Sequence, residues 1–335
     1  MKEKNYLIYF MQTFGILLVV LGHSFYQTQD NNRFVDWIYS FHMPLFFFVS
    51  GYLLKYTTRL KGISLGAMKL WGEGGYLTHK ARRLLIPYVV ISTAVFIPKA
   101  AASALSVRPV GFSLHDYLHM MVYPYDNVIG SFWFMPTIFI VFVIVAYGSR
   151  LLSGRWLTLL MVLTMAADAV WGLDRESPLN IKGAAYYLFY VALGYWFCRS
   201  GIETKFNPAV STSVAVITFR LSIAFVTKIP EFIGSEVIAA VNGIAMSIAL
   251  GQLYVASRLK FLNHLYGATF TIYLLSWFPQ VASQQLLLAV TDVPWPVTTT
   301  LAFISGVYVP LIVYRWVQSN KSCRAARAVA WVIGL

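Results

Sequence analysis

The chain has 335 residues, of which 58% are hydrophobic and only 12% are charged. Soluble globular proteins carry about 25% charged residues, so this composition excludes an ordinary soluble fold and predicts an integral membrane protein. The formal net charge of +13 does not indicate nucleic-acid binding, because the basic residues are scattered between apolar segments. The two cysteines, Cys198 and Cys323, are far apart and predict neither a disulfide nor a metal site.

Apolar segments of about 17 to 25 residues can cross a bilayer as helices. The sequence contains ten such segments, which predict an all-α integral membrane protein with ten transmembrane helices. They cover residues 6–26, 37–55, 84–105, 132–149, 156–172, 184–200, 208–227, 233–256, 265–287 and 297–317. The first segment lacks a small-residue cleavage site, so we expect an uncleaved transmembrane helix rather than a signal peptide.

Lysine and arginine alternate between the two sides of the predicted helices. Nineteen of the 26 lie on the side of the N-terminus and of the loop 55–83, six lie on the other side, and Arg220 falls within a helix. The positive-inside rule therefore places both termini in the cytoplasm. Residues 1–318 are predicted to form a single transmembrane domain. Residues 319–335 are predicted to form a basic amphipathic tail that contacts lipid at the cytoplasmic surface.

Two histidines lie inside predicted transmembrane helices, His23 in the first and His42 in the second. Ionisable side chains inside a membrane are costly, which makes both of them candidates for function. Both fall in the outer halves of adjacent antiparallel helices, and a neutral imidazole accepts a proton from a hydroxyl at ordinary pH. We predict that His23 is a general base. For His42, proton transfer and substrate positioning are both open, and a structural hydrogen bond is the alternative for either histidine.

Gln12 precedes His23 by eleven residues, which is close to three helical turns. The two side chains therefore share one helix face and lie about 16 Å apart along it. This face either lines a passage from the cytoplasmic half toward His23 or uses Gln12 to bind a neighbouring helix.

The predicted cytoplasmic loop 55–83 carries seven lysines and arginines and a single acid, Glu73. Membrane orientation and anionic lipid headgroups explain the scattered lysines. Arg82 and Arg83 stand at the start of the third helix, and arginine offers paired donors to phosphate. We therefore predict that these two arginines bind a phosphorylated ligand.

Arg220 lies near the middle of the seventh predicted helix. A charged side chain at this depth is expected to face the bundle or a water-filled cavity and to have a partner. Asp168 lies within the fifth predicted helix, which favours a structural Asp168–Arg220 ion pair. A contact between Arg220 and a substrate is the alternative.

Aromatic residues gather on the predicted outer side. Trp133 opens the fourth helix, and tryptophan both prefers membrane interfaces and stacks on sugar faces, so it is a candidate for binding a carbohydrate. The outer loop at residues 106–131 contains His115, His119 and Asp126. This loop either lines a polar acceptor site or is an ordinary interfacial loop.

Six segments, in this order along the chain, resemble the membrane acyltransferase-3 family, and within it the bacterial sugar O-acetyltransferases related to fucose 4-O-acetylase. They are residues 21–24 (LGHS), 41–52 (FHMPLFFFVSGY), 82–88 (RRLLIPY), 132–136 (FWFMP), 194–196 (GYW) and 272–274 (IYL). The first two are the most specific, and the resemblance covers most of the chain.

The resemblance implies a ten-helix bundle in the bacterial inner (cytoplasmic) membrane that needs no metal. It also implies transfer of an acyl group, usually acetyl from acetyl-CoA, to a hydroxyl of an extracytoplasmic glycan or glycolipid. The family's essential histidine corresponds to His23. The chain departs from the family pattern at Gln12, where members often have arginine, and at Ser276, where members often have histidine. The first departure removes a positive charge that some members use for CoA or for the acyl carbonyl.

Together these features predict acetyl-CoA bound from the cytoplasm at Arg82 and Arg83, its pantetheine arm running past Gln12, and an acceptor near Trp133 and His42. An acetyl-histidine intermediate and a longer acyl donor are alternatives. A non-enzymatic exporter or flippase of a polysaccharide or lipid-linked sugar is another. The sequence specifies neither the acceptor sugar nor the oligomeric state.

Overall fold

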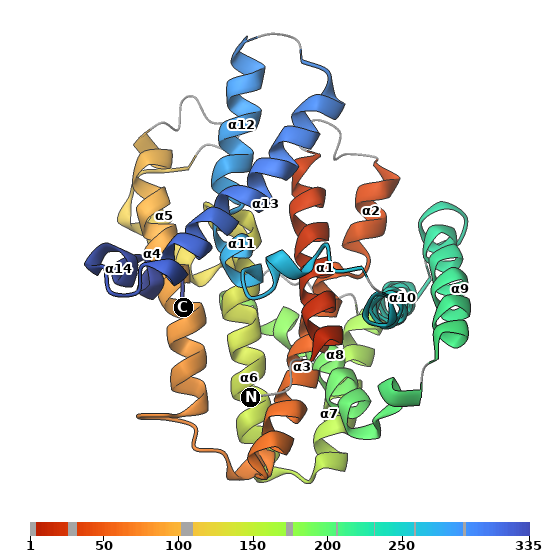
Figure 1. The fold of residues 1–335 in the computed structure, drawn as a ribbon. Helices are drawn as coiled ribbons and strands as arrows, with labels where there is room; N and C mark the ends of the chain where they lie inside the picture. Colours follow the sequence, from red (N-terminus) through yellow and green to blue (C-terminus); the bar gives the residue numbers. More distant parts are fainter. Residues whose placement is uncertain are drawn as a thin grey trace. The chain divides into compact units, whose positions relative to one another are not determined.

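The computed structural model describes residues 5–25, 32–101, 110–171, 177–205, 207–230, 232–257, 259–290 and 293–335. Every regular element within these residues is a helix (Figure 1). The predicted all-α class is therefore confirmed. A helix satisfies all its backbone hydrogen bonds within one segment, which is what a chain in hydrocarbon requires.

Seven helical segments among the described residues are long and apolar enough to cross a membrane. They are Tyr6–Ser24, Arg33–Lys61, Tyr76–Ala101, Gly130–Leu151, Pro208–Thr227, Ser235–Ala256 and Trp295–Ser319. The other three predicted segments are also helical, but they are not among these seven. The count of ten transmembrane helices and the cytoplasmic location of the termini therefore stay predictions.

The chain divides into two compact units. The first contains Met1–Leu54 and Leu193–Ser319, and the second contains Lys55–Ala192 and Asn320–Leu335. Two long helices, α3 (His42–Lys61) and α8 (Ile181–Ser200), contribute residues to both units. Each unit is described by itself below.

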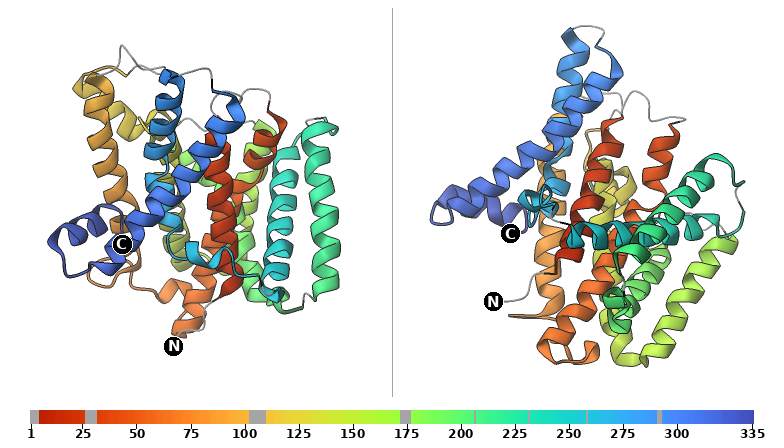
Figure 2. Two further views of the ribbon diagram at one scale, coloured as in Figure 1. Left: turned by 45° about the horizontal axis from the view of Figure 1, so that its top comes forward. Right: turned by 45° about the vertical axis from the view of Figure 1, so that its right-hand side comes forward.

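The first unit is arranged around α1 (Tyr6–Ser24), which is buried on most sides, as expected for a helix that is apolar all round. α1 packs against α10, α11 and α13, and the short α2 connects it to α3. Two pairs of helices lie side by side, α9 with α10 and α12 with α13 (Figure 2). The bounds are α2 Arg33–Tyr39, α9 Pro208–Thr227, α10 Ser235–Ala256, α11 Thr269–Leu275, α12 Trp277–Val290 and α13 Trp295–Ser319, with the 3₁₀ turns η6 Ile202–Lys205 and η7 Asn263–Leu265.

Two glycines set close helix contacts in this unit. A Cβ atom at Gly194 of α8 would overlap the backbone carbonyl of Phe48 on α3. A Cβ atom at Gly243 of α10 would overlap the ring of Phe41, which belongs to the buried core cluster with Leu18, Ile38 and Met246. Small residues at such positions let helix backbones approach closely within a membrane.

The second unit is arranged around α4 (Tyr76–Ala101) and α6 (Phe134–Leu151), which pack against each other. The C-terminal helix α14 packs against α4, with Ala326 and Ile333 buried and Trp331 exposed. The remaining elements are η1 Leu65–Ala67, α5 Leu114–Val122, η3 Pro124–Asp126, η4 Gly130–Trp133, α7 Gly154–Trp171, η5 Pro178–Asn180 and α14 Arg324–Val332.

Candidate functional site

His23 occupies the last turn of α1, and its side chain is exposed although both of its neighbours in the chain, Gly22 and Ser24, are buried. Within the described part of the chain, no hydrogen bond engages its imidazole ring. An imidazole that is reachable and not already hydrogen-bonded is available to a substrate, which is what a general base requires.

Tyr39 lies beside both histidines. Its ring centroid is 6.0 Å from that of His23 and 5.1 Å from that of His42. Tyr39 ends α2, and it reaches this position by packing over Gly22, where a Cβ atom would come within 2.7 Å of the tyrosine ring. The structure therefore brings the two predicted site histidines together around a tyrosine that the sequence did not single out.

His42 is the first residue of α3 and is buried, with 6% of its surface exposed. Its Nδ1 lies 2.9 Å from the backbone carbonyl of Ile38. A carbonyl oxygen only accepts, so Nδ1 donates and the neutral ring keeps Nε2 as its acceptor. This hydrogen bond holds the orientation of the ring, which suits positioning of a hydroxyl at least as well as proton transfer.

Two glutamines of α12 hold the end of α1 that carries His23. The buried Gln280 amide donates from Nε2 to the Val20 carbonyl at 2.8 Å and to Ser24 Oγ at 2.9 Å. Gln284 Nε2 donates to the Ser24 carbonyl at 3.3 Å. The last four carbonyls of a helix have no partner within the helix, and the Ser24 carbonyl is one of them, so Gln284 acts as a cap supplied by another helix while Gln280 ties the last turn of α1 to α12.

These glutamines were missed from the sequence, although a signal exists. Two glutamines four residues apart share one face of a helix, and in a predicted membrane helix each needs a partner. Gly306 on α13 leaves room for Gln280, because a Cβ atom there would come within 2.8 Å of the glutamine Cγ. Ser276, where relatives often have histidine, is buried at the junction of α11 and α12.

Gln12 lies on α1 as predicted and is half-buried. Between it and His23, on the same helix face, Ile16 and Val20 are buried, with at most 1% of their surface exposed. The polar groups on this face are therefore separated by an apolar stretch rather than joined in a continuous polar row.

Arg82 and Arg83 are exposed on the second turn of α4, in the second unit. The C-terminal segment packs next to them, because a Cβ atom at Gly334 would lie 2.6 Å from the Arg83 carbonyl oxygen. Helix α14 adds Arg324 and Arg327, both exposed. Four exposed arginines thus lie on the two helices that pack together here.

Trp133 ends η4 and is half-buried in an aromatic stack. Its ring lies nearly parallel to Tyr125 at 5.2 Å and to Tyr187 at 5.6 Å between centroids. Trp133 is therefore part of a three-ring stack in which Tyr187 is buried, so a sugar would meet the half-buried Trp133 and Tyr125 rather than an isolated indole.

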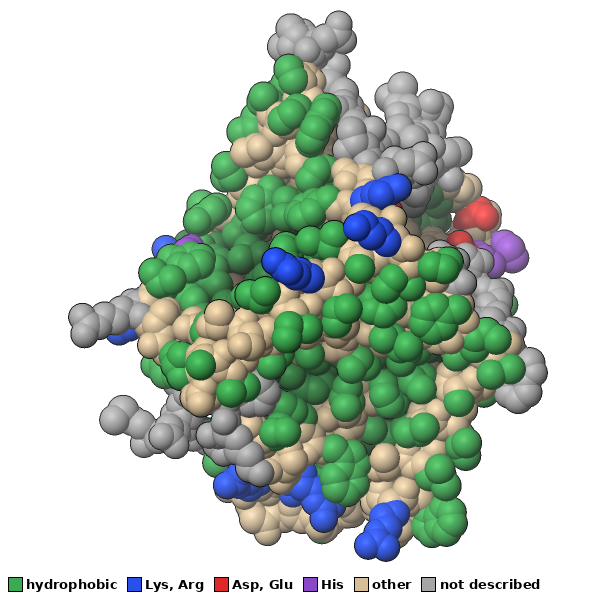
Figure 3. All heavy atoms as spheres, turned by 90° about the vertical axis from the view of Figure 1, so that its right-hand side faces the viewer, with side chains coloured by type: hydrophobic (Ala, Val, Ile, Leu, Met, Phe, Trp, Pro, Cys, Tyr) green, Lys and Arg blue, Asp and Glu red, His purple; other side chains and the backbone are tan. Residues whose placement is uncertain are grey.

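Arg220 does not face the interior of its own unit, and its orientation toward a water-filled cavity stays a prediction. Its side chain is exposed on α9, among exposed apolar neighbours such as Ile217 and Phe219. Helix α9 buries only a narrow stripe of small residues, Ser211, Ala215, Thr218 and Ser222, and Arg220 falls outside it. The face of the molecule that carries α9 is mostly apolar (Figure 3). Asp168 is buried on α7 in the other unit, so the Asp168–Arg220 pair stays a prediction.

The structure thus brings His23 and His42 together, with Gln12 farther along the same helix as His23. Arg82, Arg83 and Trp133 belong to the second unit. In the described ranges, no group of three or more histidine, cysteine, aspartate or glutamate side chains is arranged to hold a metal ion.

Comparison with known proteins supports one family. The sequence profile of the acyltransferase-3 family, described as an acyltransferase domain, matches residues 5–315. The nodulation protein NolL of Mesorhizobium japonicum is 30% identical over 192 residues, which cover 55% of this chain and 45% of NolL, so the chain spans less than half of that relative. No solved structure matches the chain. Because the profile extends over nearly the whole sequence, the chain belongs to the acyltransferase-3 family of membrane acyltransferases.

Proposed function

We propose that the protein transfers an acetyl group from cytoplasmic acetyl-CoA to a hydroxyl of an extracytoplasmic glycan or glycolipid. The observation that carries the proposal is the exposed imidazole of His23 at the capped end of α1, next to Tyr39 and His42. Membership of the acyltransferase-3 family supports the reaction class.

In the proposed reaction His23 takes the proton of the acceptor hydroxyl as the oxygen attacks the thioester carbonyl. The tetrahedral intermediate then collapses, the carbon–sulfur bond breaks, and the CoA thiolate takes up the proton held by His23. The products are an acetyl ester and free CoA. General base catalysis of this kind contributes roughly 10²–10⁴-fold to a rate.

His42 suits a helper role in this reaction. Its Nδ1 hydrogen is already donated to the Ile38 carbonyl, which leaves Nε2 to accept a hydrogen bond. A second hydroxyl of the acceptor, donating to Nε2, would orient the reacting hydroxyl for transfer of its own proton to His23. Removal of His42 is therefore expected to weaken transfer less than removal of His23.

The donor is proposed to bind through its phosphates at Arg82 and Arg83, whose exposed guanidinium groups offer paired donors. Gln12 contributes an uncharged amide to the pantetheine arm, which contains amides that it can hydrogen-bond. Trp133 and its half-buried neighbour Tyr125 are proposed to contact the acceptor. For Arg220, the exposed position on α9 favours an anionic group of a lipid or of a lipid-linked acceptor over a buried partner.

The test is transfer from radiolabelled acetyl-CoA in proteoliposomes containing a bacterial lipid extract as the source of acceptor. His23→Ala is expected to lower transfer at least 100-fold. His264→Ala is the control, because His264 is exposed and donates to the Phe261 carbonyl from an unrelated turn. Wild-type transfer by His23→Ala would refute the proposed base, and the absence of any CoA dependence would favour an exporter.

A further inference from the structure

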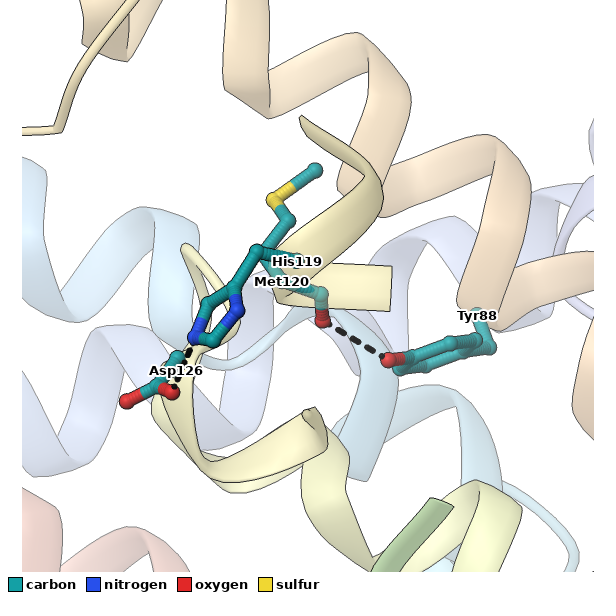
Figure 4. A network of polar contacts seen from close by, with 4 residues as sticks. All are labelled: Tyr88, His119, Met120 and Asp126. Atoms are coloured by element: carbon teal, nitrogen blue, oxygen red, sulfur yellow. Dashed lines mark hydrogen bonds and ion pairs between the residues drawn. The ribbon is translucent and has the colours of Figure 1, made fainter. Parts of the chain in front are cut away.

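A second pair of catalytically capable side chains lies in the loop between α4 and α6. His119 of α5 and Asp126 of η3 point toward each other, with Nε2 3.0 Å from Oδ2 (Figure 4). A carboxylate accepts, so Nε2 of the imidazole carries the hydrogen. Nδ1 then keeps its lone pair, and no described residue hydrogen-bonds to it.

The pair rests on a loop that is tied firmly to α4. The Tyr88 hydroxyl donates to the carbonyls of Met120 and Met121, at 3.2 and 3.1 Å, directly after His119 (Figure 4). Directly after Asp126, the buried Asn127 exchanges hydrogen bonds with Ser92. These hydrogen bonds fix the backbone directly after His119 and directly after Asp126, and they therefore hold the two side chains in position, as a binding site requires.

A structural role does not account for the pair. The two side chains are 45% and 53% exposed, and even a full ion pair with this exposure would contribute only about 0–1 kcal/mol. A metal site needs further ligands, and the described residues supply no group of three. The groups left open by the pairing, His119 Nδ1 and the second oxygen of Asp126, are both hydrogen-bond acceptors.

The surroundings resemble those of a sugar site. The His119 ring is stacked on Tyr123 at 4.5 Å between centroids, which holds the imidazole plane. Tyr125, directly before Asp126, begins the aromatic stack that contains Trp133. Rings offer an apolar face to the C–H groups of a pyranose, and paired acceptors match neighbouring hydroxyls. The distribution of basic residues predicts that this loop faces outward, on the side where an acceptor glycan would be.

We propose that His119 and Asp126 bind the acceptor through two neighbouring sugar hydroxyls, one donating to His119 Nδ1 and one to Asp126. This inference rests on the proposed function for the identity of the acceptor, but the sugar site itself is independent of acyl transfer. The pair selects acceptors by the arrangement of their hydroxyls and takes no part in the chemistry at His23.

The experiment measures binding of methyl glycosides of glucose, galactose, mannose and fucose to the full chain in lipid nanodiscs, by saturation-transfer NMR without acetyl-CoA. At least one glycoside is expected to bind the wild type. His119→Ala and Asp126→Asn are expected to weaken it at least tenfold while leaving the melting temperature unchanged. His264→Ala is the control, because His264 is exposed in an unrelated turn, where its Nδ1 bonds to the Phe261 carbonyl.

The outcomes separate the two proposals. Binding that is equal in the wild type and in both variants, or that is absent from the wild type for all four glycosides, overturns the sugar site. Binding that depends on His119 and Asp126 supports it even where acetyl transfer fails, and that failure would then count against the proposed function alone. His23→Ala is expected to bind the glycoside normally and to lower acetyl transfer at least 100-fold.

Discussion

Gln280→Leu isolates the support that α12 gives to the end of α1 that carries His23. Leucine has nearly the same volume as glutamine, so the variant removes the amide and leaves little empty space. It deletes the two hydrogen bonds to Val20 and Ser24, at 2.8 and 2.9 Å. The Ser24 hydroxyl keeps its own bond to the Val20 carbonyl at 2.7 Å, so each of the two groups retains one hydrogen bond, the carbonyl as acceptor and the hydroxyl as donor.

The expected loss of stability is modest. A buried hydrogen bond contributes about 0.5–1.5 kcal/mol net in a soluble protein, and about 0.6 kcal/mol on average between membrane helices. Two such bonds therefore correspond to about 1–3 kcal/mol. The expected loss of activity is larger, because a displacement of a catalytic group by about 1 Å can lower a rate about 100-fold. We expect kcat to fall about 10- to 100-fold while KM for acetyl-CoA changes less than twofold.

The assay combines steady-state acetyl transfer with a thermal melt of the same preparation. Gln285→Leu is the matched control, because Gln285 is the neighbouring glutamine of α12 and its side chain is exposed. Gln285→Leu is expected to behave like the wild type in both measurements. A Gln280→Leu variant that melts early but keeps its kcat would refute a positioning role. It would show that the glutamine only holds the helices together.

Two further predictions concern packing and topology. Gly194→Ala places a methyl group against the backbone carbonyl of Phe48, which cannot move aside, so we expect the melting temperature to fall by several degrees. Gly130→Ala is the control and is expected to be neutral, because the space around the Cβ position of Gly130 is open. Backbone N–H groups in the first turn of α14 lower the pKa of the exposed Cys323 thiol. Its thiolate therefore persists as the pH falls, and a membrane-impermeant maleimide is expected to label it at a pH where ordinary thiols react slowly. Labelling only from the cytoplasmic side would confirm the predicted topology, and labelling from outside would contradict it. Cys198 is buried and serves as the thiol that is not labelled.

Helical periodicity was enough to find part of the site. It placed Gln12 and His23 on one face of α1, because the angle between residues of a helix depends only on their separation. Periodicity did not show that Ile16 and Val20, which lie between Gln12 and His23, are buried. Their burial depends on which side chains of other helices pack against this face of α1, and the spacing of residues along the sequence does not contain that information.

Arg220 shows where a general rule was insufficient. A charge in the middle of a membrane helix is expected to turn inward, yet α9 buries only its stripe of small residues, and Arg220 lies outside this stripe. The rotation of a helix about its axis is set by its neighbour, here α10. The charge of a single residue does not outweigh packing along the whole length of the helix.

By itself the sequence determined the helical class and the family, and it predicted which histidine acts as a base. A long apolar segment in lipid has few backbone conformations that satisfy its hydrogen bonds, which fixes the helical class. The motif around His23 is continuous along the chain, so it can be recognised without the fold. Only the tertiary structure brought Tyr39 beside His23 and His42, bound Gln280 to the last turn of α1, and joined His119 to Asp126. These contacts join side chains from different helices and turns, so they exist only once each unit has packed.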